Sequence, residues 1–104
     1  FTVAAGATVT ILFDNEDYTP HNLVIAQPGS GEAVGTAADA LGAQGFVKQF
    51  IPDSDEIIVA SDLLSYGEFE VLTFTAPTEP ADYEVLCTFP GHRGTMHGIM
   101  TVEQ

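Results

Sequence analysis

The sequence is short of basic residues, cysteine and long apolar runs. Its 104 residues include one Lys and one Arg against 15 Asp and Glu, which gives a formal charge of −13. Nucleic-acid binding depends on Lys and Arg that neutralise phosphates, so this charge excludes an ordinary nucleic-acid-binding protein. The single cysteine, Cys87, excludes an internal disulfide. No apolar run approaches the roughly 20 residues that a membrane-spanning helix needs.

The length and the hydrophobic content indicate one folded domain. Hydrophobic residues make up 45% of the chain, which is enough for a core and excludes intrinsic disorder. We therefore expect residues 1–104 to form a single domain. The chain opens at Phe1 with neither Met nor a basic-then-apolar leader, which we interpret as a mature or trimmed chain, or one domain of a longer protein.

Short strand patterns separated by turn residues dominate the chain. Val9, Ile11 and Phe13 alternate with threonines, the period of a strand with one buried face. Similar patterns predict strands at 21–26, 57–60, 67–76, 83–87 and 98–102, with an edge strand at 1–3. Many short strands joined by Gly- and Pro-containing turns are typical of a β-sandwich or barrel.

Residues 32–50 follow a different pattern and predict a helical insertion between two strands. Gly42 and Gly45 are expected to weaken or end this helix, and a second short turn is expected before Pro52. The apolar residues at helical spacing are Val34, Ala37, Ala38 and Leu41.

The segment that carries chemistry lies near the carboxyl end. Cys87, His92 and Met96 stand at C-x4-H-x3-M, a thiolate, an imidazole and a thioether, and this set of soft and borderline ligands suits copper. A turn at 90–91 lets Cys87 and His92 face one centre. Taken alone, Cys87 would more often be a small buried hydrophobe. Met100 alternates with its neighbours like a strand residue, so we assign it to the core.

A trigonal copper site needs a second imidazole, and two histidines remain. His97 follows Met96 directly, so its side chain is expected to diverge from the site. His21 opens an apolar strand far upstream, where sheet pairing can bring it close. A lone His21 would by itself more often be a core histidine, and its weight comes from the rest of the set.

At these residues the sequence resembles the azurin-type blue copper proteins, the cupredoxins, including auracyanin-like domains. The resemblance covers nearly the whole chain. His21-Asn22 with its apolar run resembles the first-ligand motif of the family, and residues 52–75 resemble the middle section of azurin. Residues 83–96 resemble its ligand loop, and residues 87–92 read CTFPGH.

The resemblance implies an all-β fold, a Greek-key β-sandwich with one type 1 copper at one end. His21, Cys87 and His92 would bind copper strongly, and Met96 would be a long axial ligand. The copper would cycle between Cu(I) and Cu(II), so the expected function is one-electron transfer through the edge of His92. We expect no enzymatic activity, because no open substrate position or acid–base pair is evident.

The resemblance also assigns residues around the ligands. Asn22 and Thr88 would hydrogen-bond to tie the two ligand segments together, and the backbone amides of Asn22 and Phe89 would donate to the Cys87 sulfur. Pro20 stands where azurins have a glycine whose carbonyl lies near copper. A proline keeps that carbonyl but fixes φ.

The acidity leaves two explanations open: an environment of high salt, or steering toward a basic partner such as a cationic cytochrome c or an associated or fused oxidoreductase. We favour salt, because the acids are spread along the whole chain. The alternative functions are a copper carrier or buffer, and a binding module that has lost copper. A periplasmic or other extracytoplasmic location follows from the resemblance alone.

Overall fold

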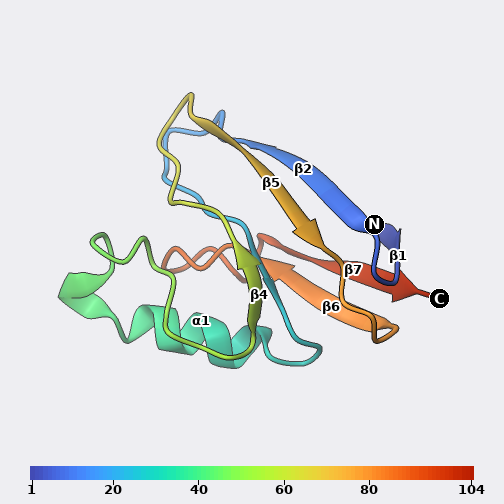
Figure 1. Cartoon of the computed structure of the whole chain (residues 1–104). Helices are drawn as coiled ribbons and strands as arrows, with labels where there is room; N and C mark the ends of the chain where they lie inside the picture. Colours follow the sequence, from blue (N-terminus) through green and yellow to red (C-terminus); the bar gives the residue numbers. More distant parts are fainter.

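The computed structural model describes residues 1–104 and consists of two β-sheets and one helical insertion (Figure 1). The larger sheet has the order β1-β7-β6-β3-β4, and β2 pairs with β5 in a smaller antiparallel sheet. This arrangement confirms the all-β sandwich with a short helical insertion. The strands are β1 (Thr2–Ala4), β2 (Thr8–Asp14), β3 (Val24–Ala26), β4 (Ile57–Ala60), β5 (Phe69–Thr75), β6 (Ala81–Leu86) and β7 (His97–Glu103).

Strand β3 is buried on both faces and separates two parts of the core. On one face, Val24 and Ala26 pack with Val34 of the insertion and Leu86 of β6. On the other face, Ile25 packs in the cluster that lies between the sheets. A strand covered on both sides has no solvent face, which explains why its sequence is a continuous apolar run rather than an alternation.

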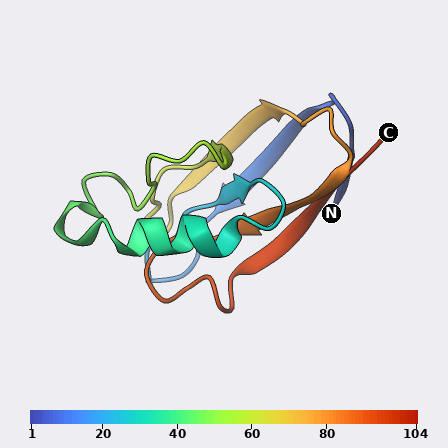
Figure 2. The same ribbon diagram turned by 90° about the horizontal axis from the view of Figure 1, so that it is seen from below.

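The insertion contains helix α1 (Gly31–Asp39) and a 3-10 turn, η1 (Gly42–Gln44). Figure 2 shows α1 lying across the larger sheet. A carboxylate from β6 stabilises the start of α1, because the N–H of Gly31 donates to Oε2 of Glu84 at 2.6 Å. The helix ends before Gly42, whose φ of 53° does not continue it. No helix in the fold is long and apolar enough to cross a bilayer.

The strand expected at 21–26 is shorter than the apolar pattern indicates. Strand β3 begins only at Val24, whereas His21 forms an isolated bridge with Leu64. Between them, the N–H of Leu23 donates to the hydroxyl of Ser61 rather than to a ladder carbonyl. Residues 21–23 are therefore held to segment 61–64 without continuing the regular ladder.

The two chain ends lie together at one end of the sandwich. Strand β1 pairs in parallel with β7, and the N-terminal ammonium group donates to the carbonyl of Ile99 at 3.0 Å. In Figures 1 and 2 both termini lie at the opposite end of the molecule from the loops that follow α1 and β6.

Candidate metal centre

Three side chains, one of them far from the other two in sequence, converge at the end of the sandwich away from the termini. The Sγ atom of Cys87 lies 3.8 Å from Nδ1 of His21 and 3.6 Å from Nδ1 of His92. The three donor atoms all lie within 4.8 Å of one another. Cys87 and His21 are buried, and His92 is partly exposed.

Pairing between neighbouring strands creates this convergence. Cys87 follows the last residue of β6, and β6 pairs with β3, whose amino end follows His21. The bridge to Leu64 fixes the backbone of His21 through two hydrogen bonds of 3.0 and 2.8 Å. His92 directly follows the turn predicted at 90–91, where Gly91 has a φ of 85°, and its N–H donates to the carbonyl of Phe89 at 3.1 Å.

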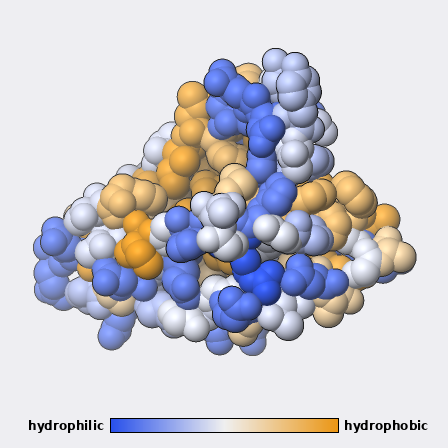
Figure 3. All heavy atoms as spheres, turned by 180° about the vertical axis from the view of Figure 1, so that it is seen from behind, coloured by the Kyte–Doolittle hydropathy of each residue, from blue (hydrophilic) through white to orange (hydrophobic).

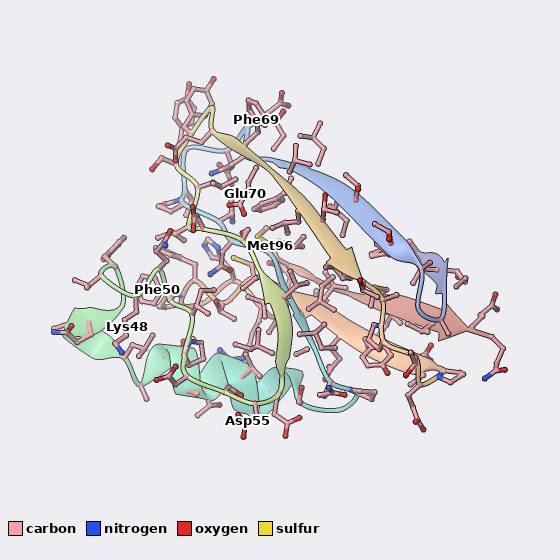
Figure 4. The ribbon with its side chains drawn as sticks, in the orientation of Figure 1. Lys48, Phe50, Asp55, Phe69, Glu70 and Met96 are labelled. Atoms are coloured by element: carbon pink, nitrogen blue, oxygen red, sulfur yellow. The ribbon has the colours of Figure 1, made fainter.

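Met96 is brought back to the same site by a tight turn. Its N–H donates to the carbonyl of His92 at 2.8 Å, and its own carbonyl accepts from the N–H of Cys87 at 3.1 Å. Met96 lines one pocket with His21 and another with Cys87, and Figure 4 shows its side chain in the interior of the molecule. Met100 is fully buried in the core, as predicted, and His97 is exposed.

The donor set fits a copper ion. Bonds of about 2.0 Å to nitrogen and about 2.3 Å to sulfur, as zinc makes with the same donors, would place two donors about 3.7 Å apart at a trigonal angle. The two sulfur–nitrogen separations, 3.6 and 3.8 Å, bracket this spacing. A trigonal site of two His and one Cys with a nearby Met is the arrangement of blue copper proteins. The site is therefore compatible with one type 1 copper.

Burial shifts the pKa values of His92 and Cys87 in opposite directions. Burial lowers the pKa of His92, with a smaller contribution from the neighbouring His21, and this favours the neutral imidazole that a metal requires. Burial raises the pKa of the Cys87 thiol, and hydrogen bonds from the backbone N–H groups of Asn22 and Phe89 oppose the rise. A metal ion must displace the proton of Cys87, and these two N–H groups stabilise the resulting thiolate.

Asn22 and Thr88 form a buried link between the two ligand segments. The side-chain amide of Asn22 donates to Oγ1 of Thr88, and the N–H of Thr88 donates to Oδ1 of Asn22, both at 2.8 Å. Each residue is at most 2% exposed. The hydrogen bonds implied by the resemblance are thus present, and they connect the residues that follow His21 and Cys87.

Two backbone carbonyls of the insertion accept hydrogen bonds from Asn22 and Thr88, and the sequence analysis did not predict them. Asn22 also donates to the carbonyl of Gln49 at 3.0 Å, and the hydroxyl of Thr88 donates to the carbonyl of Phe50 at 2.6 Å. Gln49 and Phe50 both have a φ of 56°, a left-handed conformation that is uncommon for residues other than glycine. No sequence pattern indicates this use of backbone carbonyls.

An aromatic cluster connects His92 to the surface of the insertion. The rings of Phe89 and His92 have centroids 4.9 Å apart, and Phe89 also packs against Phe50 and Phe46 at 5.2 and 5.9 Å. Phe46 and its neighbour Val47 are 65% and 78% exposed. Figure 4 shows Phe50 turned toward the sheets and Lys48 projecting outward.

This end of the molecule carries no acidic residue on its two main segments. Residues 40–52 and 85–102 contain none of the 15 acids but both basic residues, Lys48 and Arg93. Elsewhere, hydrophilic side chains are spread widely, as the rear view in Figure 3 illustrates. The partly exposed His92 therefore lies between two segments that carry no acid of their own, on an otherwise acidic protein.

Three contacts with acidic residues around the site were not predicted. The Nε2–H of His21 donates to Oδ2 of Asp17 at 3.0 Å. Arg93, next to His92, pairs with Glu32 and Asp39 of α1 at 3.0 Å each, and these hydrogen bonds raise its pKa. The only sequence signal for Asp17 was its position four residues before His21, in a segment with two other acids.

The comparisons with known proteins agree with this geometry. A family model described as copper binding proteins of the plastocyanin/azurin family matches residues 1–103. Auracyanin-A of Chloroflexus aurantiacus is 39% identical over 103 residues, covering 97% of this chain and 62% of the relative. Azurin of Pseudomonas aeruginosa is 33% identical over 93 residues, covering 81% and 63%. The chain thus spans just under two thirds of the length of these two relatives.

Solved structures give the same result for the fold. Dithionite-reduced auracyanin from the photosynthetic bacterium Roseiflexus castenholzii has a TM-score of 0.89 at 38% identity, covering 100% of this chain and 83% of that one. Auracyanin A, described as a "blue" copper protein of Chloroflexus aurantiacus, has a TM-score of 0.87 at 36% identity, covering 99% and 84%. The chain therefore belongs to the copper-binding plastocyanin/azurin family.

Proposed function

We propose that the protein carries single electrons on one type 1 copper held by His21, Cys87 and His92, with Met96 as a weak axial ligand. The observation that carries the proposal is the convergence of one sulfur and two Nδ1 atoms within 4.8 Å. A copper in this site would supply one-electron chemistry between Cu(I) and Cu(II). The protein would then transfer electrons and carry out no bond-making reaction of its own.

The surrounding residues hold the donors in place before a metal arrives. The Asn22–Thr88 link and the Leu64 bridge fix the segments that carry Cys87 and His21. Donors fixed by a packed shell reorganise little when the charge of a bound ion changes, which favours rapid electron transfer. Pro20, directly before His21, is assigned to this shell by the resemblance alone.

The route for electrons is proposed to run through the edge of His92. This ring is partly exposed, whereas His21 and Cys87 are buried. The surface beside it is apolar at Phe46 and Val47. A redox partner, such as a cytochrome c or an associated oxidoreductase, would dock there and approach the ring closely. Because its relatives are auracyanin and azurin, we also propose a periplasmic or other extracytoplasmic location.

A visible absorption spectrum tests the proposal. One equivalent of Cu(II) is added to the metal-free protein, followed by ascorbate. We expect a strong blue band that ascorbate bleaches reversibly, and no such band in Cys87→Ser, because thiolate-to-copper charge transfer produces the colour. A wild-type protein without the band would overturn the proposal, and rapid loss of Cu(I) to a weak chelator would instead indicate a copper carrier.

The route is tested separately with His92→Gly. Electron exchange with a cytochrome c should slow in this variant and recover when imidazole is added, because free imidazole can occupy the vacated position. Thr95→Gly, an exposed change in the same loop, serves as the control. Exchange in His92→Gly as fast as in wild type would refute the route.

A further inference from the structure

The carboxylate of Asp17 contacts the face of His21 that points away from the metal centre. The Nε2 atom of His21 lies 3.0 Å from Oδ2 of Asp17, while Nδ1 of the same ring faces the Cys87 sulfur. The imidazole is buried, but the carboxylate side chain is 63% exposed. An ionised carboxylate has no proton to donate and can only accept hydrogen bonds. The carboxylate is therefore an acceptor, and His21 keeps its proton on Nε2.

The loop around Asp17 is built so that this carboxylate is held in place. Asn15 is buried and its amide donates to the carbonyls of Thr19 and Leu64 at 3.1 and 2.9 Å. Its Oδ1 accepts from the N–H of Asp17 at 2.9 Å. These contacts fix the backbone of Asp17 independently of any metal.

We propose that Asp17 is a positioning residue that fixes the tautomer of His21 and shifts the metal centre toward the oxidised state. The proposal rests on the electron-transfer function proposed above. The physical reason is that a carboxylate acceptor makes the hydrogen-bonded imidazole a stronger electron donor at its other nitrogen. A stronger donor stabilises Cu(II) more than Cu(I), and therefore lowers the reduction potential.

Glu16 offers a matched control for the loss of the negative charge of Asp17. Glu16 is exposed, lines the same pocket as Asp17 and His21, and makes no hydrogen bond to His21. Asp17→Asn and Glu16→Gln remove the same charge from neighbouring positions. A difference between the two variants therefore measures the charge on the acceptor that contacts His21 rather than the general electrostatic field.

The experiment measures the reduction potential of wild type, Asp17→Asn and Glu16→Gln loaded with copper. In Asp17→Asn we expect the preference for Cu(II) over Cu(I) to fall about tenfold, because partners of ligating histidines change metal affinity by about 10- to 100-fold. For a one-electron couple, a tenfold change corresponds to a rise of about 59 mV. In Glu16→Gln we expect a much smaller rise. Equal shifts in both variants, or no shift in Asp17→Asn, would overturn the proposal.

A second measurement uses the metal-free protein. Nitrogen-15 NMR of the imidazoles reports which ring nitrogen of His21 carries the proton. We expect the Nε2–H form in wild type and in Glu16→Gln, and a mixture of tautomers in Asp17→Ala. An unchanged tautomer in Asp17→Ala would refute the positioning role. Failure of wild type to give the blue band would instead reject the electron-transfer function, so the two failures are distinguishable.

Discussion

Replacing Asn22 tests whether the buried link, rather than the metal, holds the two ligand segments together. In Asn22→Ala the metal-free protein loses three side-chain hydrogen bonds, two with Thr88 and one with the carbonyl of Gln49. At about 1 kcal/mol each, and more where a buried partner is left unsatisfied, the loss is about 3 kcal/mol or greater. This is a large fraction of the 5–15 kcal/mol by which domains are typically stable.

The assay is urea unfolding of the metal-free protein, because bound copper would mask the effect through linkage. A loss of about 3 kcal/mol corresponds to a fall in melting temperature of roughly 12–24 °C. The control is Thr10→Ala, which removes an exposed hydroxyl contact with Thr73 at 3.3 Å and should cost less than about 0.5 kcal/mol. An Asn22→Ala loss no larger than that of the control would refute the reasoning.

A milder variant covers the case in which Asn22→Ala does not fold. Thr88→Val keeps the shape and the N–H but removes the hydroxyl that bonds Asn22 and Phe50. We expect it to cost about 1–3 kcal/mol. Where Asn22→Ala does fold, a double-mutant cycle with Thr88→Val should give a coupling energy of at least about 0.5 kcal/mol, and additive losses would contradict a shared link.

Three further predictions use urea unfolding of the metal-free protein. Gly45→Ala should lose about 1–3 kcal/mol, because an added Cβ would overlap the ring of Phe50; an unchanged midpoint would contradict this close contact. Arg93→Gln should lose about 1 kcal/mol more than Lys48→Gln, which removes the same charge without breaking an ion pair, and the difference should shrink in 1 M salt. The free energy of unfolding of wild type should rise from 0.05 to 1 M NaCl, since salt screens repulsion within a chain of charge −13. A urea midpoint independent of salt would show that repulsion among the acids does not destabilise the fold.

Patterns within short segments predicted the many short strands, the helical insertion and the common centre of Cys87 and His92: alternation in β2, helical spacing around Val34, and the spacing of the ligand loop. The choice of a sandwich over a barrel came from the resemblance to the cupredoxins. The pairing of β3 with β6 had to be assumed. The complete set of ligands supported it, because the site needs His21 beside Cys87.

What the sequence did not indicate depends on backbone direction and long-range charge pairs. The carbonyls of Gln49 and Phe50 take part through an unusual φ, and any residue carries a carbonyl, so no residue type marks them. Arg93 had 15 acids as possible partners, and nothing local selects Glu32 and Asp39. The apolar run at 21–26 overstated β3 because hydrophobicity does not distinguish a ladder from an isolated bridge.

The direction of β7 determines how a segment that follows the carboxyl end can be attached. Because β7 begins next to the ligand loop and the C-terminus lies at the opposite end of the sandwich, a tether or fused domain at that terminus would extend away from His92. The apolar surface at Phe46 and Val47 would stay open to a partner, and the tether would set the reach and the local concentration of the electron carrier. Attachment at the carboxyl end and docking beside His92 are thus separated along the molecule.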